Sequence, residues 1–213
     1  WVSLTYLLSH TERIRGGVYV SGNTYRHPAV LAKMATSLDI ISNGRLILGI
    51  GGAYRKSEHT FYGIPYYTTG ERIRQLDEAC ELITKLWSLK PGEHANFQGK
   101  YYSLKDAPFE PQPVQKPHPP IMIGGGGERL TLRVVAKWAD WWNLHIRPLR
   151  EVQRKLDVLR QHCEAVGRNY DDIKKTVGMP LVMTPDRDRG RATAERMAQR
   201  RGIPLEDVIT SNY

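Results

Sequence analysis

Two periods of apolar residues alternate along this chain, and together they predict helices separated by short strands. The clearest helical pattern covers residues 28–42, where Leu31, Met34, Leu38 and Ile41 recur at spacings of three and four residues. One apolar face repeated at this period is typical of a helix packed on a core. The same period predicts further helices over residues 71–89, 128–139, 149–166 and 189–201.

Short apolar runs between these helices predict β-strands. Residues 45–50 contain Leu46-Ile47-Leu48-Gly49-Ile50, a continuous apolar run typical of a strand buried on both faces of a parallel sheet. Strands that alternate with helices imply right-handed crossovers and parallel pairing. The predicted strands are residues 13–20, 45–50, 121–123, 141–144 and 174–183.

The number of strands predicts an incomplete barrel. A closed (β/α)8 TIM barrel has eight strands, and the pattern gives five. We therefore expect an α/β fold of this class, as a single partial domain over residues 1–213, that lacks the first two barrel strands and the last one. The chain opens on Trp1, and residues 1–8 have the pattern of the middle of a helix, so we expect a segment before it. Open sheet edges predict that residues 1–213 alone aggregate or need a partner.

Three stretches depart from this alternation. Residues 51–69 have no clear period and are expected to form a loop. Residues 96–104 are typical of a β-hairpin, with Gln98-Gly99 at its tip. Residues 108–120 are rich in proline, which leaves little room for regular structure.

The charge balance adds a preference for an anionic ligand. The formal net charge is +9 and the pI is about 9.6, but the basic residues are scattered and resemble no nucleic-acid-binding motif. No apolar run approaches the ~20 residues needed to cross a bilayer. Cys80 and Cys163 fall on apolar helix stripes and lack metal-ligand spacing, so we expect buried thiols, no metal, and a reducing, cytoplasmic compartment.

The strongest local signal is a buried strand that opens into Gly124-Gly125-Gly126-Gly127 and then a helix. Glycine lets the backbone approach a ligand closely, and a helix N-terminus offers free N–H groups to a phosphate. A flexible turn would need fewer glycines, so the pattern favours phosphate binding. The spacing matches neither a Walker loop nor a dinucleotide fingerprint.

Two other strands end in small or polar residues, at the edge of a barrel where active sites lie. One continues into Gly51-Gly52-Ala53-Tyr54, and the other into Ser21-Gly22-Asn23. His27 directly precedes a helix, where a histidine more often caps or packs than reacts. His59 and His145 receive the same interpretation.

Few groups in the sequence are suited to act as nucleophiles or proton relays. There is no G-x-S-x-G elbow, no H-E-x-x-H motif and no pair of carboxylates at strand ends. The sequence therefore indicates chemistry carried out by a bound cofactor.

Taken in order, these segments resemble the luciferase-like oxidoreductases, a family of F420-dependent enzymes and FMN-dependent monooxygenases. The resemblance covers nearly the whole chain. It is carried by residues 11–15, 22–33, 38–39, 42–46, 48–51, 70–72, 97–102, 119–127 and 139–140.

The resemblance implies a cofactor lying across the strand ends. It implies a bulge, often with a non-proline cis peptide, near Val18-Tyr19 behind the ring, and a phosphate-binding turn at residues 125–127. The residues implied to contact the cofactor are Val18, Tyr19, Ser21, Gly52, Ala53, Tyr54, Ser57, Gly125, Gly126 and Gly127.

The family leaves the reaction open between two cofactors. The basic chain favours coenzyme F420, whose phosphate and glutamate tail are anionic, with FMN and O2 as the alternative; a non-catalytic cofactor-binding barrel is a third reading. Some F420-dependent dehydrogenases have a carboxylate where Tyr54 stands, and a tyrosine with an ordinary pKa of about 10 cannot replace that base. The catalytic residues are therefore unassigned. We expect a small organic substrate, no nucleic-acid or membrane partner, and a homodimer for the full-length protein.

Overall fold

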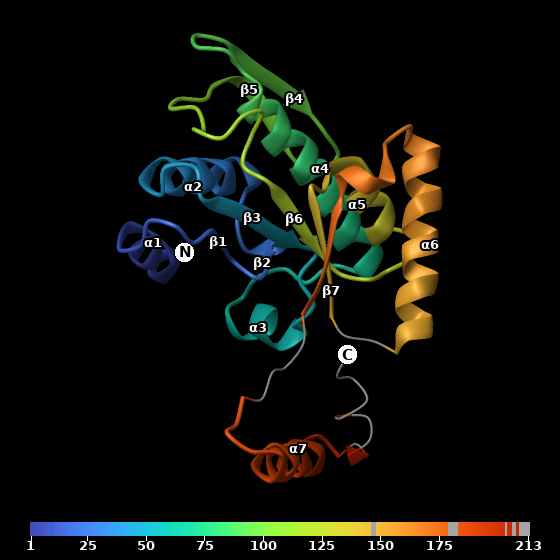
Figure 1. The fold of residues 1–213 in the computed structure, drawn as a ribbon. Helices are drawn as coiled ribbons and strands as arrows, with labels where there is room; N and C mark the ends of the chain where they lie inside the picture. The colour runs from blue at the N-terminus through green and yellow to red at the C-terminus, as the bar shows by residue number, and fades with distance from the viewer. Residues whose placement is uncertain (146–147, 179–182, 203, 206–207, 209–213) are drawn as a thin grey trace.

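The fold is a parallel half-barrel with helices packed against it (Figure 1). The computed structural model describes residues 1–145, 148–178, 183–202, 204–205 and 208. Within them, the main sheet has the order β1-β3-β6-β7-β8, β2 also pairs with β3, and every pair is parallel. Its strands are β1 (Gly16–Gly17), β2 (Ser21–Gly22), β3 (Leu46–Gly51), β6 (Ile121–Gly124), β7 (Trp141–His145) and β8 (Lys174–Gly178).

Helices connect the strands, as the periodicity predicts. The element α2 (Pro28–Ile41) buries Leu31 and Leu38 and half-buries Met34, but Ile41, predicted on the same face, is exposed at the end of the helix. The next helix, α4 (Thr69–Trp87), starts two residues before the predicted Glu71, because Thr68 and Glu71 form a capping box. The other helices are α1 (Val2–Ser9), α3 (Lys56–Phe61), α5 (Thr131–Trp138), α6 (Leu149–Val166) and α7 (Arg187–Arg201), with 3-10 turns η1 (Asn23–Tyr25) and η2 (Tyr170–Asp172).

The core confirms that β3 is buried on both faces. All six residues of β3 are buried, and Leu46, Leu48 and Ile50 belong to one apolar cluster with residues of α2, α4, α5 and α6. Cys80 and Cys163 are both free and buried in this cluster, as expected. A strand with apolar side chains on both faces fits between a helical layer and the barrel interior.

The first predicted strand, residues 13–20, is wrong in extent. The structure has two short strands in its place, β1 and β2, which pair with the two ends of β3. The Tyr19-Val20 peptide between them is cis, one residue beyond the position that the family resemblance implies. Periodicity could not show this interruption, because Val18, Tyr19 and Val20 form one continuous apolar run across it.

Other departures have local causes. The predicted loop 51–69 contains the short helix α3, whose only buried residue is His59, so it has no apolar stripe to reveal it. The hairpin is confirmed, but it is longer: β4 (His94–Gln98) pairs with β5 (Ser103–Pro108), and its turn is residues 99–102, because Gln98, predicted at the tip, pairs with Ser103. Glu78 of α4 accepts hydrogen bonds from the backbone N–H groups of residues 100–102, which ties the turn to the helix. The predicted strand 174–183 is β8 as far as residue 178; residues 179–182 lie outside the described residues.

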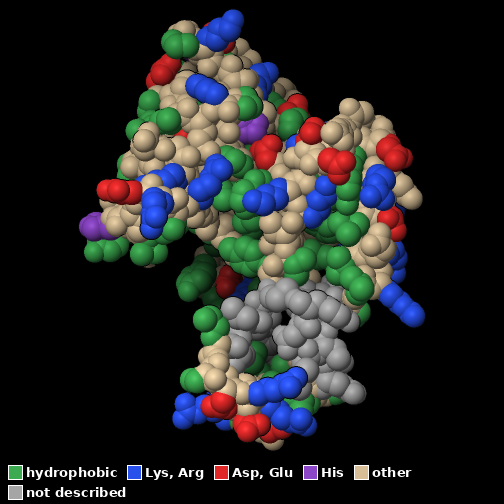
Figure 2. All heavy atoms as spheres, in the orientation of Figure 1, with side chains coloured by type: hydrophobic (Ala, Val, Ile, Leu, Met, Phe, Trp, Pro, Cys, Tyr) green, Lys and Arg blue, Asp and Glu red, His purple; other side chains and the backbone are tan. Residues whose placement is uncertain are grey.

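The surface has no single basic block on the face that Figure 2 shows. Lysine and arginine side chains alternate there with aspartate and glutamate. No helix in the described part of the chain is both long and apolar enough to cross a membrane.

Candidate active site

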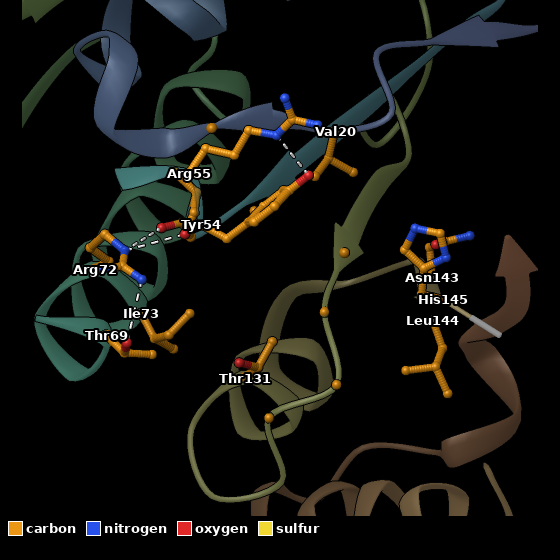
Figure 3. A pocket seen from close by; sticks show the side chains of 18 of the residues that line it. Val20, Tyr54, Arg55, Thr69, Arg72, Ile73, Thr131, Asn143, Leu144 and His145 are labelled. Atoms are coloured by element: carbon orange, nitrogen blue, oxygen red, sulfur yellow. Dashed lines mark hydrogen bonds between the residues drawn. The ribbon is translucent and has the colours of Figure 1, made fainter. Parts of the chain in front are cut away.

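A cleft of about 830 Å³ opens where the strands end at their carboxyl edge. In Figure 3, Tyr54, Arg55 and Arg72 form one wall and Asn143, Leu144 and His145 form the opposite wall. Parallel strands place their C-terminal ends at one edge of the sheet, so residues far apart in sequence meet there. The other lining residues are Tyr19, Val20, Gly22, Tyr25, Gly51, Gly52, Ala53, Glu58, Thr69, Ile73, Gly124, Gly125, Gly126, Gly127, Thr131, Glu151 and Lys155.

The glycine loop after β6 lines one end of this cleft with backbone. Gly125 has a φ of 132°, which L side chains rarely adopt, and a Cβ on Gly126 would lie 2.7 Å from Leu144 Cδ1. At Gly127 a Cβ would lie 2.8 Å from Thr131 Oγ1. The loop therefore needs glycine for its conformation and for the close approach of its neighbours.

The carbonyl groups of this loop are turned to the protein. Trp142 Nε1 donates to Gly125 O at 2.7 Å, and Lys155 Nζ donates to Gly126 O at 2.8 Å. Leu132 N donates to Gly127 O at 3.0 Å. Among the described residues, the N–H groups of Gly126 and Gly127 have no hydrogen-bond partner. Free N–H groups just before the N-terminus of α5 suit an anion.

Lys155 places a positive charge beside the loop. Its side chain is 9% exposed and reaches Glu128 Oε1 at 3.1 Å and Glu151 Oε1 at 3.5 Å. The hydrogen bond from Lys155 is the main reason why the pKa of Glu128 lies below its usual value. The ammonium group thus fixes the loop and offsets two carboxylates at the same time.

Arg72 has the same role in the loop after β3. Its guanidinium donates to Gly52 O at 3.1 Å, to Ala53 O at 3.2 Å and to Tyr67 O at 2.6 Å, and it lies over the Tyr66 ring. Ala53 has a positive φ of 54°. One buried cation therefore holds a strained turn in place at the edge of the cleft.

A polar cluster on α3 closes that side of the cleft. Tyr25 Oη donates to Glu58 Oε2 at 2.5 Å, and Arg55 contacts Glu58 Oε1 at 3.4 Å. Burial, and then the hydrogen bond to Glu58, raises the pKa of Tyr25 to about 12. His59 lies behind them, between Thr24 Oγ1 and Arg55 O at 2.7 Å each. Glu58 is thus a carboxylate in the cleft whose position is set by tyrosine and arginine.

The structure brings most of the predicted cofactor residues to the cleft. Tyr19 lines it next to the cis peptide. Three predicted residues do not line the cleft: Val18 is half-buried, Ser21 is buried with its Oγ accepting from Arg26 at 2.7 Å, and Ser57 is exposed on α3. The predicted residues that line the cleft are Tyr19, Gly52, Ala53, Tyr54, Gly125, Gly126 and Gly127.

Sequence reasoning missed the side chains that hold the two loops. Asn143 lies near the end of the predicted strand 141–144 and His145 directly follows it, so their place at the site could have been inferred from the strand-end rule. Lys155 and Arg72 sit inside helices, and nothing in their spacing points to a site. The histidines behave as expected in two cases: His27 caps α2 by accepting from Ala29 N, and His59 is buried and hydrogen-bonded. His145, in contrast, lines the cleft and is exposed.

In the described ranges, no group of three or more His, Cys, Asp or Glu side chains could hold a metal ion. A parallel β/α half-barrel with a glycine loop lining a strand-end cleft defines the class of β/α-barrel proteins, whose sites lie at the C-terminal ends of the strands.

Comparison with known proteins identifies the family. The chain belongs to the luciferase-like monooxygenase family, whose sequence model matches residues 1–210. It is 32% identical over 183 residues to an F420-dependent glucose-6-phosphate dehydrogenase of Microbacterium testaceum, covering 84% of this chain and 52% of that protein. It is 31% identical over 191 residues to a phthiodiolone/phenolphthiodiolone dimycocerosates ketoreductase of a Mycobacterium species, covering 88% of this chain and 49% of that protein. The chain thus spans about half the length of these curated relatives.

Solved structures confirm the fold. The monooxygenase RslO1 of Streptomyces bottropensis matches 99% of this chain and 61% of its own, with a TM-score of 0.79 and 23% identity. The F420-dependent tetrahydromethanopterin reductase of Methanopyrus kandleri matches 95% of this chain and 64% of its own, with a TM-score of 0.78 and 21% identity. The half-barrel seen here is therefore shared with luciferase-like barrels, of which it covers roughly half to two thirds.

Proposed function

We propose that this protein is an oxidoreductase that uses coenzyme F420 to exchange hydride with a small organic substrate. The observation that carries the proposal is the glycine loop, in which three consecutive carbonyls are bound by the protein and two N–H groups are left for an anion. The names of two curated relatives, both F420-dependent dehydrogenases at 31–32% identity, support the choice of cofactor.

The residues of the cleft fit a phosphorylated, ring-bearing cofactor. The N–H groups of Gly126 and Gly127 would bind the phosphate, and Lys155 would keep the loop in that shape. Val20, Ala53 and Tyr54 would contact the ring, and the turn held by Arg72 would orient it. The bound cofactor would supply the hydride chemistry, which no side chain here can provide.

The protein itself can contribute a group that holds a proton. Glu58 and His145 both line the cleft, and Glu58 is oriented by Tyr25 and Arg55. A carboxylate at this place can accept a hydrogen bond from a substrate hydroxyl. It stands four residues after Tyr54, and the position of Tyr54 is the one at which some F420-dependent dehydrogenases have a carboxylate.

The second candidate is an FMN-dependent monooxygenase that uses O2. The matched family carries the name monooxygenase, and matched structures include the monooxygenase RslO1 and a long-chain alkane monooxygenase. Both cofactors have a phosphate and a flavin-type ring, so the glycine loop serves either one.

Equilibrium titration of the purified protein with F420 and with FMN, followed by cofactor fluorescence, tests the proposal. Tighter binding of F420, with its reduction by an organic hydride donor, supports it. Tighter binding of FMN together with oxygen consumption replaces it by the second candidate. Binding without any turnover would identify a non-catalytic cofactor-binding barrel, and binding of neither cofactor would overturn all three readings.

A further inference from the structure

Three linked hydrogen bonds start at Tyr19 and Asn143, which line the cleft, and continue through Thr176. Tyr19 Oη donates to Asn143 Oδ1 at 2.6 Å, and Asn143 Nδ2 donates to Thr176 Oγ1 at 2.8 Å. Thr176 Oγ1 then donates to the main-chain carbonyl of Trp142 at 3.0 Å. These hydrogen bonds join the segment between β1 and β2 to strands β7 and β8.

The last hydrogen bond fixes the direction of the others. A hydroxyl has one proton, and two oxygens 3.0 Å apart attract only if that proton lies between them. Thr176 must therefore give its proton to Trp142 O and accept from the Asn143 amide. The amide oxygen consequently faces Tyr19, and Tyr19 must donate to it.

Tyr19 is held at this place by close packing. A Cβ on Gly178 would lie within 2.0 Å of Tyr19 Oη, so only glycine leaves room for the hydroxyl at that point of β8. Tyr19 nevertheless remains 55% exposed, because the rest of its ring faces the cleft that it lines.

Because its hydroxyl proton is donated to Asn143 Oδ1, Tyr19 can only accept a hydrogen bond from a ligand. Its phenolic oxygen keeps an unused lone pair, and it has no second proton to donate. This series of hydrogen bonds ends on the Trp142 carbonyl, and none of its side chains takes up a proton near neutral pH. It therefore orients a ligand and does not relay a proton.

We propose that the phenolic oxygen of Tyr19 accepts a hydrogen bond from the imide N–H of a flavin-type ring bound in the cleft, which makes Tyr19 a positioning residue for the cofactor. The pyrimidinedione edge shared by F420 and FMN has two carbonyls and a single N–H between them. An obligate acceptor can bind only that N–H, so it fixes how the ring lies along the edge. This inference rests on the proposed cofactor site but holds for either cofactor.

Binding of FMN and of N3-methyl-FMN to the wild type and to Tyr19→Phe tests the proposal. The methyl group removes the donor from the ligand, and the substitution removes the acceptor from the protein. For loss of one hydrogen bond we expect Tyr19→Phe to bind FMN about 3- to 10-fold more weakly. The wild type should prefer FMN over N3-methyl-FMN by a similar factor, and Tyr19→Phe should lose that preference.

The two ligands separate the alternatives. Unchanged FMN binding in Tyr19→Phe overturns the proposal. If that variant binds only N3-methyl-FMN more tightly, the wild-type preference has a steric cause, and the proposal is likewise overturned. An equal loss for both ligands would mean a structural role and would also overturn it. Failure of the wild type to bind FMN or F420 would instead overturn the proposed function. Tyr62→Phe is the matched control, because Tyr62 is 78% exposed and does not line the cleft.

Thr176 supplies an independent arm. Thr176→Val removes the hydroxyl that sets the direction of the Asn143 amide, whereas Thr176→Ser keeps it. We expect the preference for FMN over N3-methyl-FMN to fall in Thr176→Val and to return in Thr176→Ser. The same preference in both variants would show that the hydrogen-bond chain does not set the role of Tyr19.

Discussion

The loops after β6 and β3 are held in the same way but line the cleft with different groups. Both strands are buried and run into glycine, and in both loops a buried cation from a following helix binds the carbonyl groups: Lys155 after β6, Arg72 after β3. After β6, however, the lining is bare backbone, while after β3 it includes Tyr54 and Arg55. The first end is thus suited to an anion that backbone N–H groups can bind, and the second to a ring or substrate that side chains distinguish.

This comparison is tested most strongly by Lys155→Met. Loss of the ammonium frees Gly126 O and leaves Glu128 and Glu151 without their shared partner. Hydrogen bonds of charged groups contribute about 1.5–3 kcal/mol, so we expect FMN binding to weaken by about 10- to 100-fold. Riboflavin, which lacks the phosphate, should change far less. Isothermal titration calorimetry with both ligands measures the difference.

Arg154→Met is the control for this prediction, because Arg154 contacts the same Glu128 from an exposed position, with 64% of its side chain accessible. Its effect should be about 2-fold or less. Equal losses for FMN and riboflavin in Lys155→Met would mean that the β6 end does not bind the phosphate.

A smaller effect, equal for the two ligands, is expected for Arg72→Met. The carbonyls of Gly52, Ala53 and Tyr67 lose their donor, which should lower the free energy of unfolding by about 2 kcal/mol. The turn at Ala53 should loosen, and FMN and riboflavin should both bind about 3- to 10-fold more weakly. Chemical denaturation and the same titrations check this.

Arg74→Met, on the same helix, serves as the control, since Arg74 is exposed and its one side-chain hydrogen bond among the described residues is a 3.5 Å contact with the Tyr101 hydroxyl. A loss confined to FMN in Arg72→Met would contradict the division of roles between the two strand ends.

The smallest expected effect concerns Tyr25, beside the β3 end. Because burial and Glu58 raise its pKa to about 12 from an ordinary value of 10.0, the folded protein keeps this proton when the unfolded chain has lost it. The stabilisation is complete below pH 10 and is lost as the pH rises to about 12. The difference between the ultraviolet titrations of wild type and Tyr25→Phe should show one tyrosine ionising near pH 12. In Glu58→Gln that tyrosine should ionise at lower pH; an unchanged value would mean that burial alone sets the pKa.

The parallel β/α class, most helices and the glycine loop could be predicted from the sequence. These features are local: an apolar period of three and four residues defines α2 and α6, and four glycines after a buried strand leave few alternatives. The sequence also placed Tyr54 and Ala53 at a strand end. It could not find α3, since His59 is that helix's only buried residue and is held by Thr24 and Arg55 rather than by an apolar stripe.

The side chains that hold the site could not be predicted, because they are brought together by tertiary packing. Lys155 is an ordinary helical lysine in sequence, and it becomes part of the cleft because α6 packs beside α5 and below the glycine loop. Three separate segments contribute Tyr19, Asn143 and Thr176. These residues meet only because β7 pairs with β8 and the strand is interrupted between β1 and β2. Hydrogen bonds between distant segments depend on how strands stack and in which register. That information is carried by the packing of the whole sheet and leaves no period or motif in the sequence around each residue.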